Sequence, residues 1–393
     1  MKTKFVITKY NDILLCAVYE DDKLMEFIFP ETDSVPVGSI YIGHIKDIAK
    51  NINAAFVDIG GGTIGYLPLD KSHDYHVEQD IMVQVAKEAV KTKDMVLTTD
   101  ISLAGKYLAL SADRPGIGIS KKITSDETRD RLKNLIIETI ESESEYTDFL
   151  KNIGVIVRTN AAEAPEDELK HELIELAATF VDIKTKAPMR KCYSRLYAPV
   201  SEYLARIRDS RGTVEKIVTD IPEIYEECKQ YFAGSSDILD VISLYDDEVL
   251  PLIKLYSIET DIKAAHNRTV WLKSGGYLVI EHTEALTVID VNTGKNIKGK
   301  NKEKVFLETN LEAIAESARQ MRLRNISGII IIDLINLQYQ SDNKKMISAL
   351  KDELKKDRVH VKFIDITPLG LAEITREKIH RSINEILRTY KKD

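Results

Sequence analysis

A chain of 393 residues is too long to fold around a single hydrophobic core, so we expect two to four domains. With 44% hydrophobic and 30% charged residues, the composition is that of a globular protein and excludes a disordered one. The net charge of −8 at pH 7 argues against indiscriminate nucleic-acid binding, because affinity for phosphates comes from Lys and Arg.

The N-terminus and the cysteines indicate a reducing compartment. Residues 1–10 read as a strand and not as a secretory leader, and no apolar run approaches the ~18 residues that cross a membrane. The cysteines Cys16, Cys192 and Cys228 are isolated, which predicts neither disulfides nor a cysteine zinc site. We therefore expect a cytoplasmic protein without membrane contact.

Short strand patterns fill the first 100 residues. Residues 1–30 read as a meander that turns at Asn11-Asp12 and again at Asp21-Asp22. Further strands are expected in quick succession at 40–48, 54–59, 64–67, 81–86 and 95–98. Five short strands of this kind predict a small barrel of the OB type.

Glycines between Phe56 and Gly65 have the spacing of a dinucleotide-binding loop. Such a loop opens a helix, whereas this one runs into the strand residues Tyr66-Leu67 and stops at Pro68. The segment also resembles the first phosphate loop of actin- and Hsp70-type ATPases, so an ATPase is the alternative function. A simpler interpretation is a hairpin that places Phe56 opposite Tyr66. Such a pair is more often core, and if exposed it is a platform for stacking bases.

The middle of the chain mixes helix and strand. Residues 154–159 read as a buried strand, and residues 165–180 as an amphipathic helix. Residues 200–268 read as mostly helical around a strand at 216–219. From Thr269 onward strands and helices alternate, which predicts an α/β domain.

Two apolar runs in this last part end in aspartate. Residues 286–292 end in Asp290-Val-Asn292, and residues 329–333 end in Asp333. The residues between them read as a helix over 309–322 that opens with a capping box of Thr309 and Glu312. Strand, helix and strand imply a right-handed parallel crossover, with both aspartates at the carboxyl ends of parallel strands.

This arrangement favours a metal site. Carboxylate and amide oxygens are the ligands that Mg²⁺ prefers, and such an ion orients a water and neutralises charge on a phosphodiester. Lysines of residues 295–304 follow the first strand and can hold an RNA backbone. The alternative is that the aspartates only cap helices or turns.

Two long blocks now indicate a family. SGGYLVIEHTEALTVIDVNTGK (274–295) and ETNLEAIAESARQMRLRNISGIIIIDLINL (308–337) resemble the signature blocks of the ribonuclease E/G family. The resemblance implies an endoribonuclease with one Mg²⁺ per active site and no nucleotide cofactor. Its substrate would be single-stranded, A/U-rich RNA in RNA processing and decay, cut to 5′-phosphate and 3′-hydroxyl ends. A non-catalytic RNA-binding regulator with the same fold is the alternative.

The resemblance also implies roles for individual residues. Asp290 and Asp333 would bind Mg²⁺, and Asn292 would position the scissile phosphate. The residues that stack on and hold RNA near the cut would be Phe56, Tyr66 and Lys93. Tyr66 stands where the family has Phe, and stacking should survive this change.

A second implied site senses a 5′-monophosphate on the substrate. Its residues would be Gly105, Ala109, Arg158 and Thr159. An arginine fork and a hydroxyl suit a terminal phosphate. His360 stands where the family can have an Arg that supports this pocket, so we expect weaker sensing.

The family fold implies an α/β multi-domain protein. An RNase H-like domain (1–34 and 200–268) would be interrupted by an OB-fold domain (35–100) and a 5′-sensor domain (101–199). A deoxyribonuclease-I-like catalytic domain (269–393) would follow.

The end of the chain bears on assembly. The family normally continues into a CPxC zinc link and a small domain, and this sequence has no CPxC. We expect a protein without zinc that is a monomer or weak homodimer. Residues 374–390 read as a basic amphipathic helix that packs on its own catalytic domain or, alternatively, pairs protomers.

Overall fold

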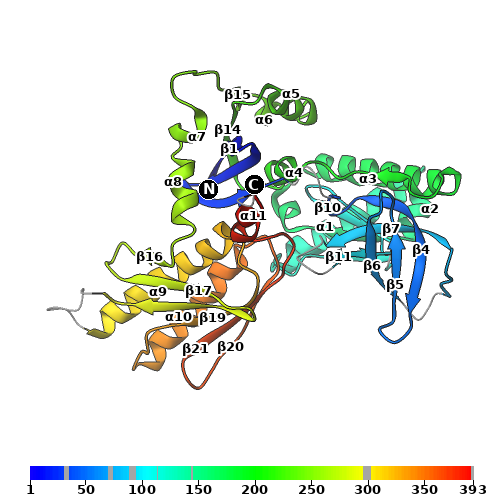
Figure 1. Cartoon of the computed structure of the whole chain (residues 1–393). Helices are drawn as coiled ribbons and strands as arrows, with labels where there is room; N and C mark the ends of the chain where they lie inside the picture. Colours follow the sequence, from blue (N-terminus) through cyan, green and yellow to red (C-terminus); the bar gives the residue numbers. More distant parts are fainter. Residues whose placement is uncertain are drawn as a thin grey trace. The chain divides into compact units, whose positions relative to one another are not determined.

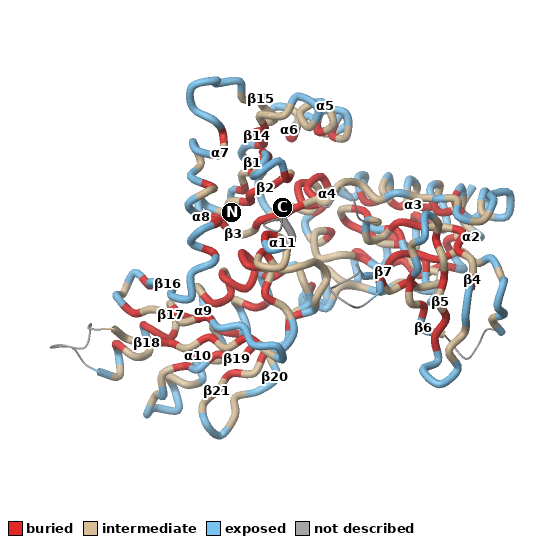
Figure 2. The backbone as a smooth tube through the Cα atoms, in the orientation of Figure 1, coloured by how far each residue is buried: buried red, intermediate tan, exposed pale blue. Residues whose placement is uncertain are grey.

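The computed structural model describes residues 1–30, 35–69, 74–87, 94–112, 114–142, 145–294 and 302–390. The chain divides into two compact units, one of residues 1–30 and 212–393 and the other of residues 31–211. Across the described ranges there are four β-sheets (Figure 1). Buried residues follow the strands and the inner sides of the helices (Figure 2). None of the described helices is long and apolar enough to cross a membrane.

The first sheet joins the N-terminus to a much later segment. Its order is β15-β14-β1-β2-β3, with strands β1 (Lys2–Tyr10), β2 (Ile13–Glu20), β3 (Lys23–Ile28), β14 (Thr213–Thr219) and β15 (Ile242–Leu244). Asn11-Asp12 and Asp21-Asp22 turn with positive φ, as tight hairpins require. The predicted meander is confirmed. Helices in this part are α5 (Pro222–Tyr231), α6 (Ser236–Leu239), α7 (Leu252–Leu255) and α8 (Ile258–Ala264).

The second sheet is a closed barrel in the unit of residues 31–211. Its strands are β4 (Ile40–Ala49), β5 (Ala54–Asp58), β6 (Ile64–Pro68), β7 (Asp80–Lys87) and β8 (Met95–Thr98). They run in the order β4-β5-β6-β8-β7, and β7 pairs back with β4. The five expected strands are confirmed, and the barrel is consistent with an OB-like fold. A short strand, β13 (Arg195–Tyr197), also pairs with β4.

The third sheet, in the same unit, has the order β11-β12-β10-β9. Its strands are β9 (Ser102–Ala104), β10 (Leu108–Ser111), β11 (Gly116–Ile119) and β12 (Gly154–Val157). The helices here are α1 (Asp126–Ser142), α2 (Thr147–Lys151), α3 (Glu166–Lys186) and α4 (Glu202–Arg208), with 3₁₀ turns η1 (Thr159–Glu163) and η2 (Ala187–Met189). The helix predicted at 165–180 is α3, which is acidic in its first turn and basic in its last, as the helix dipole favours.

The fourth sheet carries the two apolar runs. Its order is β16-β17-β18-β19-β21-β20, with strands β16 (Thr269–Trp271), β17 (Tyr277–His282), β18 (Leu286–Asn292), β19 (Gly328–Asp333), β20 (Val361–Ile366) and β21 (Leu371–Arg376). Helices α9 (Lys302–Leu323) and α10 (Gln340–Lys355) share a hydrophobic core with this sheet. Strands β18 and β19 are parallel neighbours, so the predicted parallel pairing is confirmed.

The predicted start of the helix between these strands is wrong. Helix α9 begins at Lys302, and Thr309 lies inside it at 2% exposure. Glu312 caps nothing; its carboxylate instead accepts the backbone N–H groups of Lys273 and Ser274, at 2.6 and 3.0 Å. A threonine three residues before a glutamate is the same pattern in a capping box and on an inward helix face.

The predicted C-terminal helix is also corrected. Its first part is strand β21, in which Ile374 pairs with Ile330, and helix α11 spans only Ile383–Tyr390. Ile383 and Leu387 are buried in the core of the first sheet, not in that of the fourth sheet. An apolar stripe shows that a helix packs, but it does not identify the neighbour.

A buried arginine ties α9 to the first sheet. The Arg322 guanidinium donates hydrogen bonds to the carboxylates of Glu20 and Glu26, each at 2.6 Å from Nη2. Burial alone would lower the pKa of Arg322, but the two carboxylates outweigh it and hold the pKa above its ordinary value. Arg322 therefore stays positively charged although it is largely buried, because Glu20 and Glu26 neutralise it.

Replacing this arginine should destabilise the fold. Arg322→Ala removes the cation that neutralises two mostly buried carboxylates, so we expect the free energy of unfolding to fall by about 3–5 kcal/mol. Urea denaturation followed by circular dichroism measures the change. As a matched control, Lys355→Ala removes an exposed ion pair with Asp352 and should cost about 0–1 kcal/mol. Equal effects of the two substitutions would contradict this account.

Candidate functional site

The two predicted aspartates lie side by side. In the parallel pairing of β18 with β19, Asp290 is the register partner of Asp333. Neighbouring strands are about 4.8 Å apart, and register partners lie on the same face of a sheet. The alternating residues Ile289 and Ile332 are buried in the core shared with the helices, so both carboxylates lie on the other face. There Asp290 is half-buried and Asp333 is exposed.

Asn292 belongs to the same group. It lies two residues after Asp290 on the same strand face, and its Nδ2 donates a hydrogen bond to Asp290 Oδ2 at 2.8 Å. The amide therefore orients the Asp290 carboxylate. A side-chain amide has a second N–H and a carbonyl oxygen, and these groups can meet a substrate.

Helix α9 holds two loops beside this edge of the sheet, the loop after Asp333 and the turn between β16 and β17. Asn310 is fully buried; its Nδ2 donates to the carbonyl of Ile335 at 2.7 Å, and its Oδ1 accepts the Ile335 N–H at 2.9 Å. This pair of bonds holds the loop that follows Asp333. Glu312 holds the turn between β16 and β17 in the same way. Neither role is visible in the sequence, because both are contacts between distant residues.

The donor set of this edge suits a hard cation. Two carboxylates and an amide offer only oxygen atoms as anionic or carbonyl ligands, which is the set that Mg²⁺ prefers while it keeps several waters. The basic stretch expected beside it lies mostly outside the described residues, at 295–301. Its last members, Lys302 and Lys304, are exposed at the start of α9.

Phe56 and Tyr66 face each other across the barrel hairpin. They are register partners, and their ring centroids lie 6.4 Å apart at an interplanar angle of 71°. Their neighbours Val57 and Leu67 fill the barrel core, while the two rings are half-buried on the outer face. The expectation that this pair belongs to the core is therefore wrong, whereas the expected hairpin is confirmed. Lys93 lies outside the described residues.

The four residues of the predicted sensor pocket lie around the end of β12. Arg158 follows this strand, and its Nη1 donates to the carbonyl of Gly105. Thr159 shares a hydrogen bond of 2.9 Å with the hydroxyl of Ser120. Ala109 pairs with Ile156 of β12. The structure thus brings Gly105 and Arg158 into contact and adds Ser120, which sequence reasoning missed.

Asp209 is a second residue that sequence reasoning missed. It accepts a hydrogen bond of 2.6 Å from Nη2 of Arg158. Burial would raise the pKa of Asp209, but the hydrogen bond from Arg158 and the charge of Arg208 outweigh it and lower the pKa. Arg158 is therefore held in place by a carboxylate, with one edge of its guanidinium directed at protein. His360 belongs to the other unit, where it is exposed.

Gly105 has a steric reason to be glycine. A Cβ at this position would collide with the carboxylate of Glu172. That carboxylate accepts the backbone N–H groups of Lys106, Tyr107 and Leu108 at 2.7–2.8 Å. Helix α3 thereby shapes the loop that meets Arg158.

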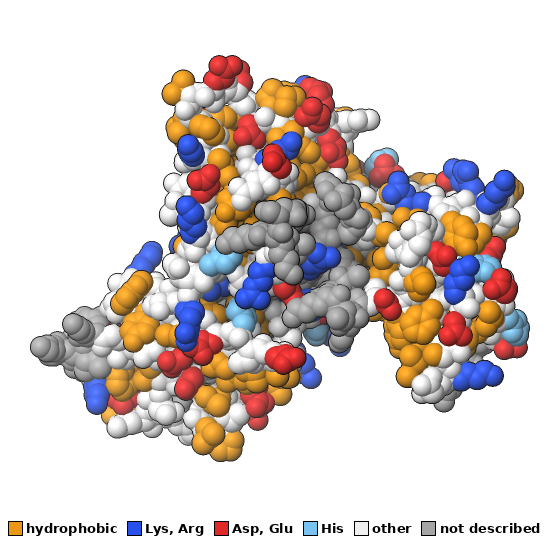
Figure 3. Space-filling view, in the orientation of Figure 1, with side chains coloured by type: hydrophobic (Ala, Val, Ile, Leu, Met, Phe, Trp, Pro, Cys, Tyr) orange, Lys and Arg blue, Asp and Glu red, His pale blue; other side chains and the backbone are white. Residues whose placement is uncertain are grey.

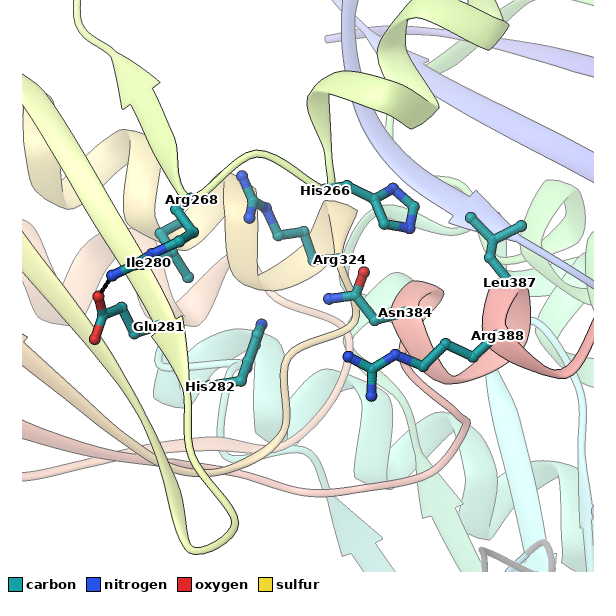
Figure 4. Close-up of a pocket in the computed structure, with 9 residues that line it drawn as sticks. All are labelled: His266, Arg268, Ile280, Glu281, His282, Arg324, Asn384, Leu387 and Arg388. Carbon is teal, nitrogen blue, oxygen red and sulfur yellow. Dashed lines mark ion pairs between the residues drawn. The ribbon is translucent and has the colours of Figure 1, made fainter. Parts of the chain in front are cut away.

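A cavity of about 530 Å³ lies elsewhere in the unit of residues 1–30 and 212–393 (Figure 4). Its lining includes three arginines and two histidines: Arg268, Arg324, Arg388, His266 and His282. Glu281 is also in the lining, paired with Arg268. Burial, together with the charges of Arg324 and Arg388, lowers the pKa of His282. Because neither aspartate lines it, this positive cavity is separate from the acidic pair.

Outside this cavity, the surface carries both acidic and basic side chains. On the face drawn in Figure 3, acidic and basic side chains are interspersed within each unit and do not gather in one field. This agrees with the modest net charge of −8. Attraction of a polyanion would therefore depend on local groups.

Comparison with known proteins identifies the relatives of this chain. The model of the "Ribonuclease E/G family" matches residues 102–379. The chain is similar to ribonuclease G of Salmonella typhimurium (strain SL1344), with 31% identity over 374 residues, which cover 89% of this chain and 74% of the relative. Ribonuclease G of Haemophilus influenzae is 34% identical over 377 residues, with the same coverage of 89% and 74%.

A longer relative extends the match. Ribonuclease E of Nostoc sp. (strain PCC 7120) is 31% identical over 405 residues, which cover 98% of this chain and 57% of the relative. The family match includes both Asp290 and Asp333. The resemblance seen in the two sequence blocks is thus confirmed, and the chain belongs to the ribonuclease E/G family of endoribonucleases.

Proposed function

We propose that this protein is a Mg²⁺-dependent endoribonuclease that cuts single-stranded, A/U-rich RNA in RNA processing and decay. The observation that carries the proposal is the parallel register that pairs Asp290 with Asp333 on an open face of the catalytic sheet. Two carboxylates on adjacent strands can share one ion. The products would be 5′-phosphate and 3′-hydroxyl ends.

The chain's own residues would divide the work. Asp290 and Asp333 would hold the ion, and Asn292 would keep the Asp290 carboxylate oriented while its remaining polar atoms face the scissile phosphate. When bound, Mg²⁺ supplies Lewis-acid chemistry that neutralises charge on the phosphate and activates a water. Attack of water oxygen on phosphorus with loss of the 3′ oxygen yields the proposed ends.

The barrel would hold the substrate. Phe56 and Tyr66 present half-buried rings on its outer face, and bases stack on such rings without regard to sequence. Lys93 would add a positive charge for the backbone. The glycine segment between the two aromatic residues is a hairpin turn of this barrel.

The four-domain division is part of the proposal. Each proposed domain contains the larger part of its own sheet: the RNase H-like domain (1–34 and 200–268), the OB-fold domain (35–100), the 5′-sensor domain (101–199) and the deoxyribonuclease-I-like catalytic domain (269–393). In the division of the chain into two compact units, helix α4 groups with residues 31–211.

Cleavage of a labelled RNA tests the proposed active site. Asp290→Asn and Asp333→Asn should each lower the rate by about 100-fold or more, because each removes a charged metal ligand. Chelation with EDTA should abolish cleavage by the unmodified protein. The control Asp352→Asn alters an exposed carboxylate of α10 and should cut normally. If the protein binds RNA but does not cut it with Mg²⁺, it is a regulator and not an enzyme.

The 5′ end of the substrate gives a second test. RNA with a 5′-monophosphate should be cut faster than RNA with a 5′-hydroxyl or a triphosphate, because Arg158 and Thr159 can bind a terminal phosphate. The stimulation should be modest, given His360. Arg158→Lys keeps the charge but loses the fork, and should remove the preference while cleavage of 5′-hydroxyl RNA persists.

A matched control for this test is Arg190→Lys, which alters an exposed arginine of the same unit. It should leave the preference for 5′-monophosphate intact. Equal rates on all three RNA ends, in the unmodified protein and in Arg158→Lys alike, would show that this pocket does not sense the 5′ end.

A further inference from the structure

We propose that Trp271 and Tyr277 form a stacking surface for an RNA base beside the cleavage site. The proposal rests on the proposed ribonuclease activity and adds a second aromatic contact, located on the catalytic sheet itself. The occupant would be a base of single-stranded RNA that neighbours the scissile phosphate.

Trp271 stands out by its exposure. It is the only tryptophan in the chain, and it is 71% exposed at the end of strand β16. Its ring lies 5.2 Å from that of Tyr277, at an interplanar angle of 55°. Large aromatic side chains stabilise a fold mainly by burial, so the exposed ring of Trp271 contributes little in that way, and Tyr277 beside it is only half-buried. Such a pair is available for a ligand with a flat, apolar face.

Strand register connects this pair to the active site. Trp271 is the partner of Tyr277, and Tyr277 is the partner of Asn292. The three residues therefore form a row across β16, β17 and β18, two residues along the strands from the row that contains Asp290. Two strand spacings, about 10 Å, separate Trp271 from Asn292. The rings thus lie within reach of a nucleotide next to one bound at the aspartates.

The row is on the open face of the sheet. The residues Val270, Leu278 and Val291 form the adjacent row, and they pack in the core with the helices. Because side chains alternate along a strand, Trp271, Tyr277 and Asn292 lie on the opposite face, with Asp290 and Asp333. One face of one sheet therefore carries both the rings and the carboxylates.

The turn that presents the rings is held firmly. The carboxylate of Glu312 accepts the backbone N–H groups of Lys273 and Ser274, between the two aromatic residues in the chain. Next to it, a Cβ on Gly276 would lie 2.7 Å from the carbonyl oxygen of Asn292, so the turn packs closely against the end of β18. A rigid platform loses little conformational entropy when a base stacks on it.

Charge favours RNA over a protein partner. Lys273 is exposed in the same turn, and Lys302 is exposed at the start of α9. Single-strand binding sites combine aromatic rings with cations that follow the backbone. The rings lie on the same face as the aspartates, and cations lie nearby. Both observations favour a nucleic acid over an apolar protein partner.

The lone tryptophan gives a direct measurement. In EDTA, where no cleavage is expected, titration with a short oligouridine should quench the tryptophan fluorescence to saturation, because stacking brings a base onto the ring. An abasic oligonucleotide with the same number of phosphates should bind with much less quenching. If fluorescence anisotropy of labelled oligouridine shows binding while the tryptophan emission stays unchanged, the base does not stack on Trp271.

Kinetics with Mg²⁺ provide an independent test. Trp271→Ala should raise KM for a short RNA by about 5-fold to 100-fold, with a smaller effect on kcat, and Trp271→Phe should restore most of the loss. The control Val249→Ala, at a residue 92% exposed, should change nothing. An unchanged KM in Trp271→Ala would overturn the proposal. So would a change in oligomeric state by light scattering without a change in KM, which would identify a protein interface.

The two tests separate the possible failures. Absence of cleavage by the unmodified protein would refute the proposed function, whereas the quenching titration needs no cleavage. Normal cleavage without quenching or a KM effect would refute only the stacking surface.

Discussion

The parallel pairing of β18 with β19 is the constraint on which the candidate site depends, because it places Asp290 beside Asp333. Such a pairing requires a crossover, and α9 provides it on the covered face of the sheet. Buried polar groups then fix this helix at two points. Asn310 holds the loop after Asp333, and Arg322 binds carboxylates of the first sheet. The catalytic edge is thus determined by packing as much as by its own residues.

Much of this could be predicted from the sequence, because apolar runs and turn residues act locally. The barrel strands, the hairpin at Phe56 and Tyr66, and the aspartate pair all follow from such patterns. Residues that act through distant contacts could not be predicted. Asp209 meets Arg158 across 51 positions of sequence, and Trp271 lies in a strand of only three residues, too short for a periodic signal.

The same physical device occurs in both units. In each, two aromatic residues on adjacent strands face each other across a hairpin whose turn contains glycines: Phe56 with Tyr66, and Trp271 with Tyr277. Opposite positions on paired strands bring rings close without burial in a core. Residues that appear as ordinary strand formers in the sequence therefore become candidate base-stacking surfaces only when the exposed face is known.

The central claim is that Asp290 and Asp333 act together on one ion. The most direct measurement compares cleavage rates of the two single Asp→Asn variants with that of the double variant, at saturating Mg²⁺ and equal RNA concentration. Residues that act as a unit are not additive, so the double variant should be no slower than the slower single variant, within about threefold. Losses that multiply in the double variant would mean that the two carboxylates work independently, and the account would be wrong.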